Sequence, residues 1–426
     1  MQNVIKKERI HLMSPCANVC AIMSFEGAPS HDEMQHAINI AVERNRILRC
    51  RVVLENDGSA FLEECVPPVG IELQEFDCGC DAGAFALEQE QLPFRLDEGE
   101  VIRFFRRSDG NHSELVVVTH HLVCDGGSLV ILAGDILSAL NGADVAEKPV
   151  RLLEASDLPK HHGLNFAMRL MLRGTNSQWR KTGRAFGFED YRRLAASYHS
   201  NHRTALYRDE LSGEQLERLK KYAHDGGFSI NSLIAAAFAS VVPAGSGVGV
   251  AVDVRPADIN GMGNFSTGIS VASEYSPEKT LSENAAHIHH QIRQKLDSPK
   301  NKFFLYDFMN AISPSLIDAI YFVRYDNYRN QLAEGICRMC GYTGEPDGIS
   351  TSNLRTVELP DSPAWRYRCD VFWFIPPYIP NVRAVAGIST YRDKMTVTLH
   401  TADDDYADYE RRQFEKACAL LKSAAE

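Results

Sequence analysis

Two predicted β-hairpins with the same Asp-Gly turn are the feature that most constrains the fold of this chain. Their turns are Asn56-Asp57-Gly58 and Ser108-Asp109-Gly110, and the strands that they join span residues 47–54, 60–65, 101–107 and 114–119. The Asp-Gly pair favours the tight turns that connect antiparallel strands. A further hairpin is predicted near the end of the chain, from residues 384–391 and 395–400. The strands therefore belong to antiparallel or mixed sheets.

Helices with clear start signals alternate with these strands. Ser30-x-x-Glu33 and Ser212-x-x-Gln215 are capping boxes, each followed by an amphipathic stretch. Apolar helical runs follow at residues 128–140 and 230–242, and the last helix spans 409–424. The pattern predicts a mixed α/β (α+β) fold of two similar lobes. We place the N-terminal lobe at residues 1–145, a basic connector at 146–208 and the C-terminal lobe at 209–426.

Charge and hydropathy exclude several classes of protein. The chain has 426 residues and 45 − 56 = −11 formal charges, so we do not expect a nucleic-acid partner. The sequence contains no run of about 18 apolar residues, so we predict no transmembrane helix. The N-terminus does not resemble a signal peptide. We therefore predict a cytoplasmic location. Residues 164–173 are both basic and amphipathic, so contact with a lipid surface, binding of an anionic cofactor and simple packing remain open for them.

The eleven cysteines are the one unusual feature of the composition. An odd number cannot pair completely. Cys16/Cys20, Cys78/Cys80 and Cys337/Cys340 are close pairs with three different spacings, whereas a zinc ribbon repeats one spacing. We therefore predict reduced thiols and no metal site.

The strongest candidate for chemistry is His120-His121-Leu-Val-Cys-Asp125-Gly126, at the end of a predicted apolar strand. Side chains alternate across a strand, so the two imidazoles must point to opposite faces and only one can enter a given cleft. A neutral imidazole is a competent general base near pH 7. Gly126 and the glycine after it allow backbone angles that other residues resist, which would let the strand turn sharply into a helix.

The spacing His-His-x-x-x-Asp-Gly resembles the active-site signature of the acyltransferase superfamily that includes chloramphenicol acetyltransferase, peptide-synthetase condensation domains and alcohol acyltransferases. Further segments resemble that superfamily in the same order along the chain. These are the arginine segment 43–51 with Arg49, Leu92-Pro-Phe-Arg-Leu-Asp97, Arg255-Pro256, Gly263-Asn264-Phe265 and Ser352-Asn353-Leu354. In the last of these, Arg355 stands where the superfamily has glycine.

The resemblance implies two chloramphenicol acetyltransferase-like lobes, each a mixed sheet flanked by helices, with an active-site tunnel at their interface. By the same resemblance, His121 is the catalytic base and His120 is structural. Asp125 pairs with Arg49 to hold the loop and is not part of a catalytic relay. Ser352 and Asn353 are candidates to stabilise the oxyanion or to bind substrate, with a local turn as the alternative. Arg255 and Asn264 are expected to act structurally, Arg255 by an ion pair that links the lobes.

The predicted function is acyl transfer from a thioester to a hydroxyl or amine of a small-molecule acceptor, without a bound cofactor. Acyl-CoA is the preferred donor, because we find no segment that resembles a fused carrier protein. A carrier-protein thioester supplied in trans, as in condensation, is the alternative donor. A lipid or polyketide acyltransferase that touches the membrane surface is a further hypothesis, and a degenerate member of the fold that only binds its ligand is the non-enzymatic one. Because both lobes lie in one chain, we expect a monomer.

Overall fold

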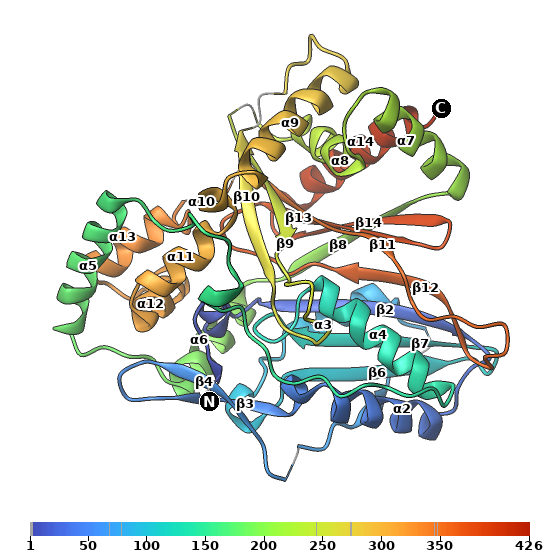
Figure 1. Ribbon diagram of the computed structural model, residues 1–426, viewed down its shortest axis with the longest axis horizontal. Coiled ribbons are helices and arrows are strands. Elements are labelled where there is room, and N and C mark those ends of the chain that lie inside the picture. The colour runs from blue at the N-terminus through green and yellow to red at the C-terminus, as the bar shows by residue number, and fades with distance from the viewer. Residues whose placement is uncertain are drawn as a thin grey trace.

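The strands form three sheets in the computed structural model, which describes residues 3–67, 69–77, 79–243, 245–272, 275–344, 346 and 348–426. The N-terminal sheet has the order β12 (Arg368–Ile375), β2 (Asn18–Glu26), β7 (His112–His120), β6 (Ile102–Ser108) and β5 (Leu73–Glu75). A small sheet has the order β1 (Asn3–Val4), β4 (Ala60–Glu64) and β3 (Cys50–Leu54). In Figure 1 the third and largest sheet lies above the N-terminal sheet, and the small sheet lies at the lower left.

The C-terminal sheet has the order β10 (Ser266–Ala272), β9 (Gly247–Asp253), β11 (Ile349–Val357), β13 (Ala384–Tyr391), β14 (Lys394–Ala402) and β8 (Thr204–Leu211). Strand β11 runs parallel to both β9 and β13, and the other pairs are antiparallel, so the sheet is mixed. Its helices are α7 (Gly213–Asp225), α8 (Ile230–Ala239), α9 (Leu281–Leu296) and α14 (Ala407–Ser423). Residues of these elements share one hydrophobic core, which makes the C-terminal lobe.

The N-terminal lobe has its own, larger core. Strands β2 and β7 are buried along most of their length, as expected of central strands covered on both faces. The helices of this part are α2 (His31–Arg44), α3 (Ala82–Glu90) and α4 (Gly126–Leu140), and both α3 and α4 contact β2. The mixed α/β fold with two sheet-and-helix lobes is therefore confirmed.

The chain does not divide between the lobes as simply as the sequence indicated. Strand β12 lies in the expected C-terminal lobe, yet it pairs antiparallel with β2 of the N-terminal sheet. An apolar strand such as β2 needs a partner on its outer edge, because an open edge leaves backbone groups unpaired. Residues of α11 (Phe304–Ala311), α12 (Pro314–Tyr325) and α13 (Gln331–Met339) also belong to the N-terminal core. The boundaries 1–145 and 209–426 thus describe the two sheets only in part.

Most local predictions agree with the structure. Ser30 and Ser212 form complete capping boxes. The predicted hairpins are β3–β4, β6–β7 and β13–β14. The first predicted strand is too long, because residues Arg46–Arg49 form a 3₁₀ turn before β3 begins at Cys50.

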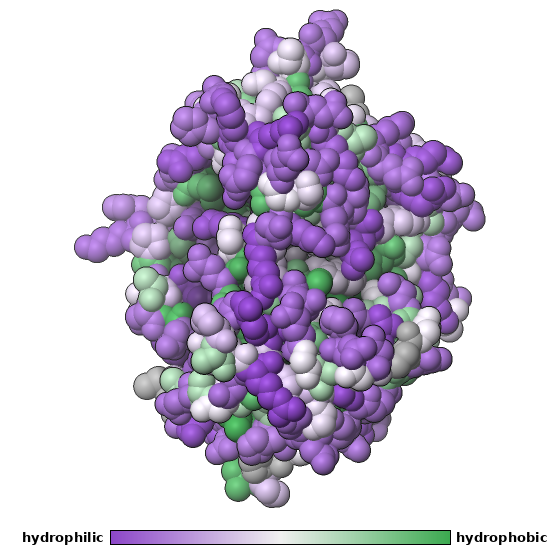
Figure 2. Space-filling model, turned by 90° about the vertical axis from the view of Figure 1, so that its right-hand side faces the viewer, coloured by the Kyte–Doolittle hydropathy of each residue, from purple (hydrophilic) through white to green (hydrophobic). Residues whose placement is uncertain are grey.

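The remaining helices are α1 (Arg9–Leu12), α5 (Phe166–Arg180), α6 (Phe188–Asn201) and α10 (Pro299–Lys302). No helix of the described residues is long and apolar enough to cross a bilayer. The ten cysteines that the structure describes are free, and Cys78 lies outside the described residues. The face seen in Figure 2 is mainly hydrophilic, with scattered apolar residues.

A buried ion pair fixes α1 against α12. Arg9 donates from Nε to Asp318 Oδ1 at 2.8 Å and from Nη2 to Oδ2, and the side chains are 1 % and 0 % exposed. Burial raises the pKa of Asp318, while the charge of Arg9 opposes that shift. Each charge is therefore tolerated in the core only because the other is present.

We predict that Asp318→Asn lowers the free energy of unfolding by about 3–5 kcal/mol, because it leaves the Arg9 guanidinium buried without a counter-ion. Urea denaturation measures this change. The matched control is Asp297→Asn, which removes an exposed pair with Arg293 at 3.8 Å and is expected to change stability by less than about 0.5 kcal/mol. Equal effects of the two substitutions would contradict the prediction.

Candidate active site

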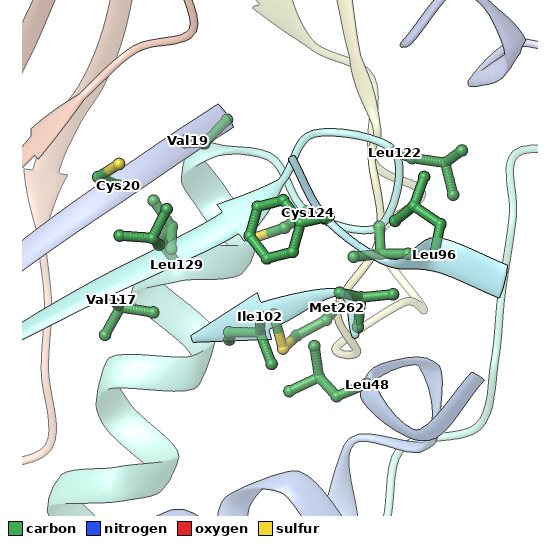
Figure 3. Close-up of a cluster of buried hydrophobic side chains, with 14 of the residues drawn as sticks. Val19, Cys20, Leu48, Leu96, Ile102, Val117, Leu122, Cys124, Leu129 and Met262 are labelled. Carbon is green, nitrogen blue, oxygen red and sulfur yellow. The ribbon is translucent and has the colours of Figure 1, made fainter. Parts of the chain in front are cut away.

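The turn that carries the histidines is anchored on both sides. The backbone N–H of His121 donates to the carbonyl of Ala17 at 2.7 Å, so the strand pairing with β2 continues past the end of β7. Leu122 and Cys124 are fully buried in the N-terminal core, and Met262 of the loop between β9 and β10 joins the same cluster (Figure 3). The turn is therefore packed from both halves of the chain.

The hydrogen bonds of His121 fix its tautomer. Its Nδ1 lies 2.7 Å from the backbone oxygen of Cys124. A carbonyl oxygen can only accept, so Nδ1 carries the hydrogen and Nε2 of the neutral ring carries the lone pair. Among the residues that the structure describes, none bonds to Nε2, and the residue is 8 % exposed. This geometry gives the ring one free basic nitrogen.

His120 lies in a different environment. Its Nδ1 accepts from the N–H of Leu122 at 3.2 Å, and its ring meets the Phe94 ring edge-on with 5.8 Å between centroids. The two adjacent imidazoles therefore contact different residues, as the alternation of a strand requires. His120 is 1 % exposed.

Burial keeps both imidazoles neutral. Desolvation lowers the pKa of His120 to about 3. Desolvation also lowers the pKa of His121 to about 4, although the bond to Cys124 and the charge of Asp125 both raise it. Near pH 7 the ring of His121 is thus unprotonated, which is the form that can accept a proton.

The Asp125 carboxylate joins the two lobes. Its Oδ1 caps α4 by accepting from the N–H of Ser128 at 2.7 Å, and it also accepts from Arg255 Nη2 at 2.9 Å. Its Oδ2 accepts from the N–H of Phe265 at 2.7 Å. Asp125 is 4 % exposed. Its three hydrogen bonds hold the turn in place, and none of them involves His121.

The expected pairing of Asp125 with Arg49 is wrong. Arg49 is bonded to Glu64 of β4, which it shares with Arg46. The 3₁₀ turn at Arg46–Arg49 directs both arginines toward the small sheet. Arg255 of the C-terminal lobe makes the ion pair with Asp125 instead, and so supplies the link between lobes that the sequence suggested for it.

Asn264 is a second link at the same place. Its Nδ2 donates to the backbone oxygen of His121 at 2.6 Å, and its Oδ1 accepts from Lys7 Nζ at 3.0 Å. Lys7 also donates to the carbonyls of Asn264 and Ser266, each at 2.7 Å. The side chain of Asn264 therefore bridges the N-terminal segment, the histidine turn and β10.

Gly126 has ordinary backbone angles, and its small size leaves room for the side chain of Leu354. Neither Gly126 nor Gly127 has a positive φ, which corrects the expectation from sequence. A Cβ on Gly126 would lie 2.3 Å from Cδ2 of Leu354, so β11 of the C-terminal lobe approaches the first turn of α4 directly.

Strand β11 also carries the proposed oxyanion residues. Asn353 bonds locally, accepting from the N–H of Arg355 at 2.7 Å, and donates to Asn231 Oδ1 at 3.3 Å. The half-buried hydroxyl of Ser352 has no hydrogen-bond partner in the described part of the chain. Arg355 has φ +61°, so it adopts the left-handed conformation usual for glycine at a bulge in β11.

Sequence reasoning missed His11. Its ring lies 4.4 Å from that of His121, centroid to centroid, on helix α1. Burial and the neighbouring His121 hold its pKa well below its ordinary value. The only signal was the unusual density of polar residues in Lys6-Lys7-Glu8-Arg9, and a four-residue helix has too few positions for its buried face to be recognised.

The sequence also led us to expect no metal site and a tunnel between the lobes. No group of three or more His, Cys, Asp or Glu side chains in the described ranges could hold a metal ion. The tunnel between the lobes stays a prediction. Of the two cavities that we describe, one of about 330 Å³ lies beside α14, and one of about 490 Å³ lies beside β4.

No family model matches the chain. A polyketide synthase–nonribosomal peptide synthetase of Aspergillus clavatus is 25 % identical over 153 residues, which is 35 % of this chain and 4 % of that protein. The similar synthetase pyiS of Pyricularia grisea is 26 % identical over 125 residues, 29 % of this chain and 3 % of that one. The chain thus matches only a small part of the length of these curated relatives.

Solved structures match over the whole chain. The first condensation domain of the CDA synthetase has a TM-score of 0.65 at 13 % identity and is covered to 97 %. The condensation domain of the monacolin K polyketide synthase MokA has a TM-score of 0.64 at 12 % identity, also covered to 97 %. This chain has the condensation-domain fold. Polyketide synthase associated protein 5 from Mycobacterium tuberculosis has a TM-score of 0.60 at 14 % identity, with 98 % covered. All three matches cover 100 % of this chain, so the resemblance to the chloramphenicol acetyltransferase-like fold is confirmed.

We predict that Gly126→Ala lowers the free energy of unfolding by about 1–3 kcal/mol, because the added methyl group meets Leu354. In a Leu354→Ala background the same substitution should be neutral or stabilising. The control is Gly174→Ala on α5, where no atom lies within 4 Å and about 0.5–1 kcal/mol of stabilisation is expected. A double-mutant cycle by urea denaturation measures the coupling, and additive effects would contradict it.

Proposed function

We propose that this protein transfers an acyl group from a thioester to a hydroxyl or amine, with His121 as the general base. One observation carries the proposal: Nδ1 of His121 is held on the Cys124 carbonyl, which leaves Nε2 as a free basic nitrogen where the two lobes meet. The condensation-domain fold supports a transferase that acts on acyl groups.

The reaction needs only groups that these residues can supply. Nε2 of His121 takes the proton of the acceptor O–H or N–H as the acceptor attacks the thioester carbonyl and a new C–O or C–N bond forms. The C–S bond then breaks, and the imidazolium returns the proton to the departing sulfur. Asp125 stabilises the transient imidazolium by its charge, as the direction of its effect on the His121 pKa indicates.

The oxyanion of the tetrahedral intermediate needs a hydrogen-bond donor. Ser352 is our candidate for two reasons. Its hydroxyl has no hydrogen-bond partner among the described residues, and Leu354, two positions later on the same strand, approaches Gly126 at the start of α4. Asn353 is less suited, since its side chain already bonds Arg355 and Asn231. Loss of one such donor typically reduces kcat by about 10²- to 10³-fold.

The donor is proposed from the relatives. Both curated relatives are polyketide synthase–nonribosomal peptide synthetases, which favours a carrier-protein thioester over the acyl-CoA donor expected from the sequence. Basic residues of the connector are weak candidates for a donor phosphate, because Arg184, Arg192 and Arg193 are all paired with acidic side chains.

We predict that His121→Ala lowers kcat/KM by about 10²- to 10⁴-fold. The assay follows thiol release and acylated product from an acyl carrier protein and, in parallel, from acyl-CoA, with a panel of alcohols and amines. His224→Ala is the matched control, because that side chain is 90 % exposed and its ion pair is with the neighbouring Asp225. Equal turnover by wild type and His121→Ala would exclude His121 as the base, whereas no turnover by wild type from either donor would favour a protein that only binds its ligand.

We also predict that kcat/KM stays high well below pH 6.5. Protonation abolishes the base, so activity falls as the pH drops through the pKa of His121, which is lowered to about 4. The measurement is a pH profile of kcat/KM, with tryptophan fluorescence at each pH to confirm that the protein is folded. An acid limb near pH 6.5 in folded protein would show that the ring is solvated.

A further inference from the structure

Helix α5 has two different faces. It packs against the rest of the protein through Leu172 and Trp179, each 1 % exposed, and the indole Nε1 of Trp179 donates to Ser315 Oγ at 2.8 Å. Asn176 adds a bond from Nδ2 to the carbonyl of Ala311 at 2.7 Å. These contacts occupy one stripe of the helix, so the opposite face points into solvent.

The outward face carries large apolar side chains. Phe166 is 74 % exposed, Leu170 60 % and Met171 42 %. Phe166 and Leu170 are four residues apart and therefore lie on one stripe, and Met171 lies about 100° further round the helix. A soluble surface tolerates single exposed apolar residues, but here Phe166 and Leu170 are neighbours on one stripe, and Met171 adds a third apolar side chain to the exposed part of the helix.

Helix α11 lies beside the start of α5 and carries a further exposed apolar residue. Asp307 of α11 bonds the ring of His162 and the N–H of Gly163, each at 2.7 Å, just before α5 begins. Phe304, one turn before Asp307, is 46 % exposed and lies at the same end of the helix pair as Phe166. The two helices lie side by side at one edge of the molecule (Figure 1).

Three arginines lie beside the apolar stripe. At 100° per residue, Arg169, Arg173 and Arg180 fall together on one side of Phe166 and Leu170. All three are exposed, and within the described ranges none of them has an ion pair. The helix contains no aspartate or glutamate. A positive surface of this kind is unusual in a chain with a net charge of −11.

We propose that this face of α5, made of Phe166, Arg169, Leu170, Met171 and Arg173 and called the α5 surface below, docks onto an anionic lipid surface. The apolar side chains enter the boundary between headgroups and acyl chains, and the guanidinium groups bind lipid phosphates. A second copy of the chain fits less well, because a symmetric contact brings arginines against arginines. Phe166 projects into solvent and does not lie in a groove. A side chain in this position can enter the surface of a bilayer.

Co-sedimentation of the full chain with lipid vesicles tests the proposal. We expect the protein to pellet with phosphatidylcholine vesicles that contain phosphatidylglycerol, but not with phosphatidylcholine alone, and to be released by high salt. Phe166→Ser with Leu170→Ser should lower the partition coefficient by at least about 10-fold. Arg169→Gln with Arg173→Gln should lower it by about 30-fold, taking roughly 5-fold for each charge.

The controls are matched in exposure and charge. Leu92→Ser removes an exposed leucine just after the end of α3, and Arg412→Gln removes an exposed arginine on α14, and both should bind vesicles as wild type does. His121→Ala should also bind normally, which separates docking from catalysis. The proposal is overturned if wild type fails to pellet at low salt, or if the α5 variants bind like the controls. Binding of an acidic carrier protein, and not of vesicles, to the α5 surface would also overturn it.

Discussion

The carboxylate of Asp125 is the interaction on which the arrangement of this site depends. It accepts from the first turn of α4, from Arg255 and from the backbone of Phe265, so one buried group fixes the histidine turn to its own helix and to the other lobe. A buried carboxylate without these donors would carry a desolvation penalty of several kcal/mol. The polar groups therefore specify how the lobes meet, while apolar packing by Met262 and Leu354 fills the same contact.

Two opposing effects of this arrangement set the basicity of His121. Burial lowers its pKa and keeps the ring neutral, but a weaker base gains less from taking a proton. The Cys124 carbonyl and the Asp125 charge act in the opposite direction, and both become more favourable once the ring is protonated. The neighbouring His11, itself held neutral by burial, packs on the ring without adding a charge near pH 7.

Local features of the fold were predictable because they depend on neighbours in sequence. Capping at Ser30 and Ser212, the Asp-Gly hairpins and the alternation at His120 and His121 all involve residues a few positions apart. The partner of Asp125 was not predictable in this way. Arg49 and Arg255 are both arginines in segments that resemble the superfamily, and only the path of the 3₁₀ turn before β3 decides that Arg49 faces Glu64. The insertion of β12 beside β2 is equally non-local.

The sequence by itself determined the elements and the identity of the histidine motif, since helix caps, turns and side-chain alternation are set by short-range sterics and hydrogen bonding. Only the tertiary structure decided which charges meet, that Leu354 approaches Gly126, and that His11 lies against His121. It also decided which face of α5 is left in solvent. These outcomes join residues up to hundreds of positions apart, and they depend on how two packed lobes close on each other, which no local pattern encodes.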